Sequence, residues 1–126
     1  MTRKTLTILA TLLLGVMCLA APGKNRYTNP ILFSDYSDPD AIRVGDDYWM
    51  TSSSFTCFPG LQILHSYDLI HWEIVSAALP DLSEDPAFDS PSHGNGVWAP
   101  CIRYNDGMYW IFWGDPDRGI YQVHTT

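Results

Sequence analysis

An Asp-Pro-Asp tripeptide, Asp38-Pro39-Asp40, is the part of the sequence best suited to acid–base chemistry. Proline fixes its own backbone angle and favours an extended conformation for the residue before it, so we expect the Asp38 carboxylate to have a set direction. A carboxylate held in this way can take a proton from water. The alternative is structural, because an Asp before a proline commonly caps a turn with its own side chain.

Short strand candidates bounded by turn residues follow this tripeptide, and no segment has a sustained helical period. The sequence therefore predicts an all-β fold. The strands are expected at 41–44, 47–52, 61–66, 71–76, 101–104, 108–113 and 119–125. An acidic, proline-containing loop between Pro80 and Asn95 is expected to lie on the surface.

The last three strands repeat the first three after about 60 residues. The sequences align at an offset of 60 for 41–44, of 61 for 48–50 and of 59 for 62–66, as if one residue had entered the second turn. A repeat of this size with up to four strands per copy is typical of β-propeller blades. We interpret the chain as about two blades of a truncated propeller, the alternative being a complete two-sheet domain.

The first 21 residues have the pattern of a secretory signal peptide, with Arg3 and Lys4 before an apolar run and small residues at its end. Residues 22–126 are then the propeller part, and the protein is expected to be secreted or periplasmic. The apolar run is too short for a permanent membrane span. A lipid anchor at Cys18 is a minor alternative.

Composition limits the partners of the protein. The chain has 7 basic and 14 acidic residues, a net charge of −7, which disfavours nucleic acid and anionic membranes as partners. Aromatic residues make up 13% of the chain, and their flat rings suit the apolar faces of sugars as well as a core. The His and Cys spacing does not predict a metal site, and Cys57 and Cys101 are expected to be free, buried thiols.

Four motifs in order resemble the N-terminal part of glycoside hydrolase family 43. They are Asn29-Pro30-Ile31-Leu32, residues 37–49, residues 58–72 and Gly96-Val97-Trp98-Ala99-Pro100. The resemblance implies a five-bladed β-propeller with inverting β-xylosidase or α-L-arabinofuranosidase activity on xylose- or arabinose-containing plant polysaccharides and oligosaccharides.

The same resemblance assigns the general base to Asp38. It places the general acid, a Glu, and the Asp that tunes the pKa of that acid further along than residue 126, so the chain alone is expected to be nearly inactive. No cofactor is expected, although the resemblance allows a structural calcium ion in the complete propeller. A second Asp-Pro-Asp, starting at Asp115, follows the second strand of its copy and is expected to form a turn.

Phe55 and Trp98 are the aromatic residues expected to contact a carbohydrate substrate. Phe55 lies between the second and third strands, a position that resembles the apolar wall of the sugar subsite in the family. Trp98 precedes the fifth strand, in a place equivalent to that of Asp38, and packing is the alternative for both rings. Family members often have Trp at the position of Cys57, so the pocket edge is expected to differ. The competing function is a non-catalytic carbohydrate-binding propeller remnant.

Overall fold

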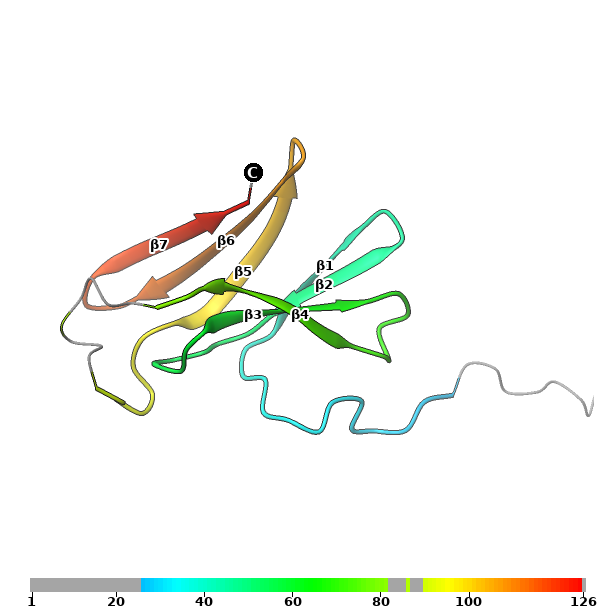
Figure 1. The fold of residues 1–126 in the computed structure, drawn as a ribbon, viewed down its shortest axis with the longest axis horizontal. Helices are drawn as coiled ribbons and strands as arrows, with labels where there is room; N and C mark the ends of the chain where they lie inside the picture. Colours follow the sequence, from blue (N-terminus) through cyan, green and yellow to red (C-terminus); the bar gives the residue numbers. More distant parts are fainter. Residues whose placement is uncertain (1–25, 82–85, 87–89, 126) are drawn as a thin grey trace, which may run out of the picture.

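The protein forms two antiparallel β-sheets in a computed structural model that describes residues 26–81, 86 and 90–125 (Figure 1). The first sheet contains β1 (Asp40–Val44), β2 (Asp47–Thr51), β3 (Gly60–Ser66) and β4 (Glu73–Leu79), and the second contains β5 (Trp98–Asn105), β6 (Met108–Asp115) and β7 (Gly119–His124). Each strand pairs with the next one along the chain. The all-β prediction and the division into a sheet of four strands and a sheet of three are confirmed for the described residues.

Three expectations fall on residues that the structure does not describe. The signal peptide at 1–21, with the alternative anchor at Cys18, lies outside the described residues, as do 82–85 and 87–89 of the acidic loop. They stay predictions. Within the described part of the chain, no helix has the length and apolar character needed to cross a membrane.

The two sheets are copies of one hairpin arrangement, which the strand register makes clear. Asp40 pairs with Thr51 in the first sheet and Cys101 with Phe112 in the second. Each residue of the first hairpin therefore corresponds to the residue 61 positions later in the second hairpin. Both β-hairpins have two-residue turns, 45–46 and 106–107, whose positive φ angles at glycine fit tight hairpin turns. The offset of 60 expected for the first strand is therefore wrong, because no residue has entered the second turn.

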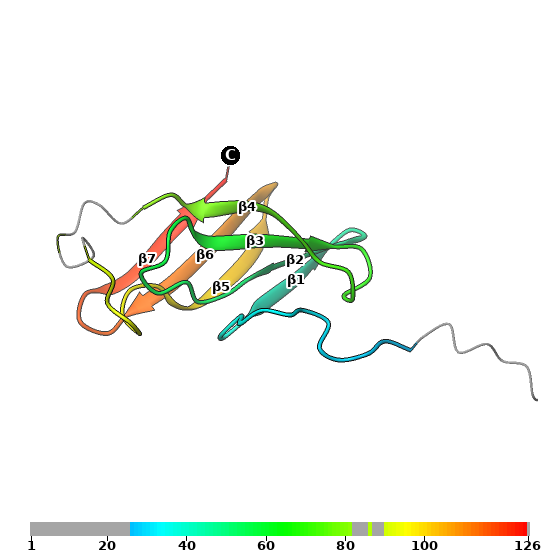
Figure 2. The same cartoon turned by 60° about the horizontal axis from the view of Figure 1, so that its bottom comes forward.

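Apolar side chains from both sheets meet between them. Figures 1 and 2 show the sheets side by side, with β1 and β2 against β5 and with β4 against β7. The buried cluster comprises Leu61, Leu79, Val97, Ile102, Ile111 and Trp113. At one side of it the ring of Trp49 meets the edge of Tyr109, with centroids 5.4 Å apart. Burial of these apolar groups is the main force that holds the sheets together.

A polar contact fixes the start of β1 against β5. The Asp40 carboxylate oxygen Oδ2 accepts a hydrogen bond from the Ile102 backbone N–H at 2.8 Å and another from Arg103 Nη1 at 2.7 Å. The hydrogen bond and the negative charge of Asp40 raise the pKa of Arg103 above its ordinary value. Because one carboxylate satisfies a backbone donor and a guanidinium of the other sheet, the two sheets are held at a fixed relative position.

Two strands begin two or more residues away from where they are expected. The fifth strand begins three residues early, at Trp98, because a bulge between Trp98 and Cys101 lets it continue its pairing with β6. The fourth strand begins at Glu73 instead of residue 71 and runs to Leu79. The reason for this late start is the turn between β3 and β4.

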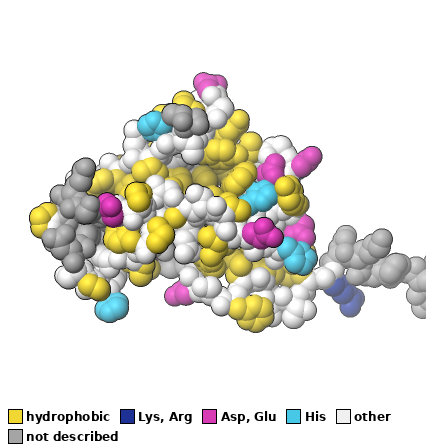
Figure 3. All heavy atoms as spheres, viewed as in Figure 1, with side chains coloured by type: hydrophobic (Ala, Val, Ile, Leu, Met, Phe, Trp, Pro, Cys, Tyr) yellow, Lys and Arg dark blue, Asp and Glu magenta, His cyan; other side chains and the backbone are white. Residues whose placement is uncertain are grey.

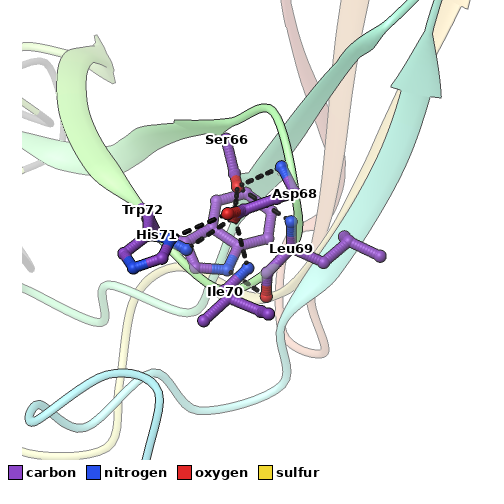
Figure 4. Close-up of polar contacts among 6 residues, drawn as sticks. All are labelled: Ser66, Asp68, Leu69, Ile70, His71 and Trp72. Atoms are coloured by element: carbon purple, nitrogen blue, oxygen red, sulfur yellow. Dashed lines mark hydrogen bonds and ion pairs between the residues drawn. The ribbon is translucent and has the colours of Figure 1, made fainter. Parts of the chain in front are cut away.

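The turn between β3 and β4 is built around the Asp68 carboxylate (Figure 4). Asp68 Oδ1 accepts hydrogen bonds from the backbone N–H groups of Ile70 and His71, at 2.9 and 2.8 Å, and Oδ2 lies 2.7 Å from His71 Nδ1. The Ser66 hydroxyl supports the same turn by accepting from the backbone N–H groups of Asp68 and Leu69. The hydrogen bonds that Asp68 accepts, chiefly from the His71 backbone and side chain, hold the pKa of Asp68 well below its ordinary value. His71 is thereby kept in the turn and out of the strand.

We predict that Asp68→Asn lowers the unfolding midpoint at pH 7. The depressed pKa stabilises the folded state above the pKa of the unfolded chain, near pH 4, and this contribution is lost as the pH falls towards the folded-state value. The difference between wild type and variant should therefore shrink below about pH 4. Urea unfolding from pH 7 to pH 2 measures it.

The matched control is Asp46→Asn, which removes a carboxylate from an exposed turn where its partner is Arg43. An exposed ion pair contributes little, so this variant should unfold almost like wild type at every pH. A constant difference for Asp68→Asn across the whole pH range would contradict the explanation.

Candidate active site

Asp38 lies two residues before β1 with its backbone in the left-handed region, at φ +49°. The expectation that it is extended is therefore wrong. Contacts from the loop after β2 accompany this conformation, since the Ser53 N–H donates to the Ser37 carbonyl at 2.9 Å and the Ser53 hydroxyl donates to Asp38. Asp tolerates the left-handed region better than most residues. Ala99, which precedes Pro100 and lies 61 positions later, has φ +39°.

This shared backbone shape shows that the expected equivalence of Trp98 with Asp38 is wrong. The residue of the second sheet that corresponds to Asp38 is Ala99, and Trp98 corresponds to Ser37. Trp98 also does not precede a strand, because it is the first residue of β5.

Two serine hydroxyl groups hold the Asp38 side chain, which is solvent-exposed. Asp38 Oδ2 accepts from Ser37 Oγ at 2.8 Å and from Ser53 Oγ at 2.9 Å. Ser53 Oγ in turn accepts from the Ala99 backbone N–H at 2.8 Å. The carboxylate is thus connected through one hydroxyl group to the residue after Trp98, on the other sheet.

Phe55 is fixed to the second sheet by its backbone. It has φ +51° and exchanges two hydrogen bonds of 3.1 Å with Val97, one in each direction. Trp98 follows Val97, and its indole Nε1 donates to the Gly94 carbonyl at 2.7 Å. Both aromatic side chains are half-buried. The structure therefore brings the segments that carry Asp38, Phe55 and Trp98 to neighbouring positions, while their roles stay predictions.

A hollow of about 340 Å³ lies beside this point, between the segment before β1 and the loop after β2. Its lining consists of Ser34, Asp35, Tyr36, Ser37, Ser52, Ser53, Ser54, Phe55, Cys57, Pro59 and Gln62. Phe55 is part of the wall, whereas Asp38 and Trp98 are not. Sequence reasoning missed Ser53, Asp35 and Gln62, because a serine in a loop or a polar strand residue gives no local signal of a site.

A larger hollow of about 520 Å³ has a mainly apolar lining of strand residues from both sheets, Trp49 and Tyr109 among them. None of Asp38, Phe55 and Trp98 lines it. We interpret it as space between the two sheets, since residues of β2 to β7 line it.

Two other acidic groups in the described residues, Asp40 and Asp115, are engaged elsewhere. Asp40 binds Arg103, and the buried Asp115 accepts from the Asp117 N–H at 2.9 Å and lies 3.3 Å from Arg118. Asp115 thus ends β6 and shapes the following turn, as its position in the sequence predicts. No cluster of three His, Cys, Asp or Glu side chains suited to a metal occurs in the described residues.

The two cysteines of the described residues are free thiols, as expected. Neither is fully buried, however, and Cys57 is exposed at the hollow beside Phe55. The expectation of two buried thiols is wrong because Cys57 lies in a loop instead of a strand end.

Comparison with known proteins identifies the family. The family described as Glycosyl hydrolases family 43 matches residues 27–126. The chain belongs to this family. Its two sheets correspond to blades of the five-bladed β-propeller found in solved family 43 enzymes, as the repeat predicts.

Several family 43 relatives are xylosidases or arabinofuranosidases. A β-xylosidase from Bacillus subtilis is 42% identical over 90 residues, which cover 71% of this chain and 17% of the relative. A non-reducing end α-L-arabinofuranosidase from Bacteroides ovatus is 32% identical over 120 residues, covering 91% and 23%. The structure of a xylan β-1,4-xylosidase from Bacillus halodurans superposes with a TM-score of 0.69 at 36% identity, covering 79% of this chain and 20% of that one. The chain spans about a fifth of these relatives.

The contact between Phe55 and Val97 depends on the absence of a side chain at Gly96. Gly96 has φ +99°, and a Cβ atom placed there would overlap the Phe55 carbonyl group. We predict that Gly96→Ala destabilises the protein by more than about 2 kcal/mol, because the strained backbone and the overlap act together. Urea unfolding measures this change.

Gly94→Ala is the matched control, since Gly94 also has positive φ, +80°, but has open space around the added Cβ. This variant should lower the free energy of unfolding by about 1 kcal/mol, because only the backbone strain of an alanine at positive φ acts there. Equal effects for the two variants would show that the close approach of Phe55 is unimportant.

Proposed function

We propose that the protein is an inverting glycoside hydrolase that acts on xylose- or arabinose-containing plant polysaccharides and oligosaccharides, with Asp38 as its general base. The observation that supports this most is the fixed Asp38 carboxylate, held by two hydroxyl groups beside the Phe55 and Trp98 segments. Membership of family 43 and the names of the relatives point to the same substrates.

In the proposed reaction, Asp38 takes a proton from water as the water oxygen bonds to the anomeric carbon. A carboxylic acid on the other side of the sugar gives its proton to the leaving oxygen as the glycosidic bond breaks. Inverting enzymes hold these two carboxyl groups roughly 6.5–9.5 Å apart. We assign no described residue to the acid. The proposal therefore takes the acid and its tuning Asp from outside the described residues.

Phe55 and Trp98 would supply apolar surfaces for the sugar ring. A neutral sugar also suits the charge of the molecular surface. The face in Figure 3 carries several acidic side chains, and the basic side chains visible on it lie beside the grey tail. Cys57 at the rim of the hollow would alter the edge of the sugar site. Export through residues 1–21 belongs to the proposal and rests on the sequence pattern of those residues. A structural calcium in the complete propeller rests on the resemblance alone.

The test is Asp38→Asn in the full gene product, assayed on aryl β-xyloside and aryl α-L-arabinofuranoside. Loss of the base should lower kcat/KM by about 10²- to 10⁴-fold on whichever substrate the wild type cleaves. NMR should show that the first sugar released has the opposite anomeric configuration. The control Asp106→Asn lies in the exposed turn between β5 and β6 and should retain activity.

Two results would overturn the proposal. Retention of the anomeric configuration would exclude the inverting mechanism, and wild-type activity of Asp38→Asn would exclude Asp38 as the base. A full gene product that binds xylo-oligosaccharides without cleaving any substrate would instead support the carbohydrate-binding alternative.

A further inference from the structure

We infer that Ser53 is a positioning residue for Asp38 and that it leaves Asp38 Oδ1 as the oxygen that accepts the proton from water. This inference deepens the proposed function and rests on it. It assigns a role to a residue for which the sequence motifs give no indication, and it follows from the direction of three hydrogen bonds.

The first step concerns the single proton of the Ser53 hydroxyl. The Ala99 backbone N–H can only donate, so Ser53 Oγ accepts that bond, at 2.8 Å. An ionised carboxylate can only accept, so the Ser53 proton points at Asp38 Oδ2, 2.9 Å away. The two contacts therefore fix the orientation of the hydroxyl and make it a donor to Asp38.

The second step concerns the two oxygens of the carboxylate. Oδ2 also accepts from Ser37 Oγ at 2.8 Å, so it receives two hydroxyl donors. Within the described residues, no hydrogen bond reaches Oδ1. A general base needs a free lone pair directed at the water it deprotonates. Oδ1 has this property, and Oδ2, whose lone pairs are engaged, is the oxygen by which the group is held.

The third step distinguishes Ser53 from Ser37. Ser37 is the neighbour of Asp38 in the chain, and its hydrogen bond to Asp38 involves no residue of the second sheet. Ser53 connects the carboxylate to Ala99, which follows Trp98, and it lies two residues before Phe55. Ser53 thus sets the distance between the base and the proposed walls of the sugar site, whereas Ser37 sets only the local rotation of the carboxylate.

The experiment compares Ser53→Ala, Ser37→Ala and Ser53→Thr in the full gene product on the better aryl glycoside. Ser53→Ala should lower kcat by about 10- to 100-fold, because a small misplacement of a catalytic group has effects of this size. KM should stay within about twofold, since the hydrogen bonds of the Ser53 hydroxyl are made to Asp38 and Ala99. Ser37→Ala should lower kcat less, and Ser53→Thr, which keeps the hydroxyl, should recover most of the rate.

Folding is checked by the thermal midpoint of each variant. If Ser53→Ala does not fold, Ser53→Cys, which keeps the size but donates weakly, replaces it with the same expected loss. Wild-type kcat in Ser53→Ala or Ser53→Cys, a loss equal to that of Ser37→Ala, or a rise in KM in place of the fall in kcat would each overturn the inference. Asp38→Asn separates the two levels: if it is inactive while Ser53→Ala is fully active, only the role of Ser53 fails, and if it is fully active, the proposed function fails.

Discussion

The carboxylate of Asp40 is the contact on which the geometry of this protein most depends. It accepts from a backbone N–H and a guanidinium of the second sheet and stands two residues from Asp38. Apolar burial brings the sheets together but has no preferred direction, so it cannot by itself set their relative position to the accuracy that a site requires. A directional contact at the first residue of β1 can do so. The hydrogen bond from the Ala99 N–H to Ser53 is a second such contact between the Asp38 region and the second sheet.

The two connections have different chemical tasks. The Asp40 contact pairs opposite charges and raises the pKa of Arg103, so it is suited to holding the sheets and leaves Asp40 engaged. The Ser53 contact joins an uncharged hydroxyl group to the carboxylate of Asp38. That carboxylate is exposed and stays accessible to water. Two acidic residues separated by one proline therefore differ in how they are engaged, because their partners differ.

Local pattern predicted much of the fold. Short segments rich in apolar and aromatic residues and bounded by turn residues located β1, β2, β3, β6 and β7 to within one or two residues. The failures have nonlocal or side-chain causes. The Asp68 carboxylate delays β4, and a bulge extends β5 backwards to Trp98. In the site, the motif located Asp38 but not Ser53, since the bond from Ala99 to Ser53 joins residues 46 positions apart.

The left-handed residue before each proline has a further consequence. Asp38 and Ala99 occupy the same kinked backbone in the two sheets, although an alanine gains nothing locally from this conformation. In the second sheet the kink instead aims the Ala99 N–H at Ser53. The same bend thus positions the Asp38 carboxylate before β1 and a hydrogen-bond donor to Ser53 in β5. The second sheet thus helps to fix the position of the carboxylate that stands before the first.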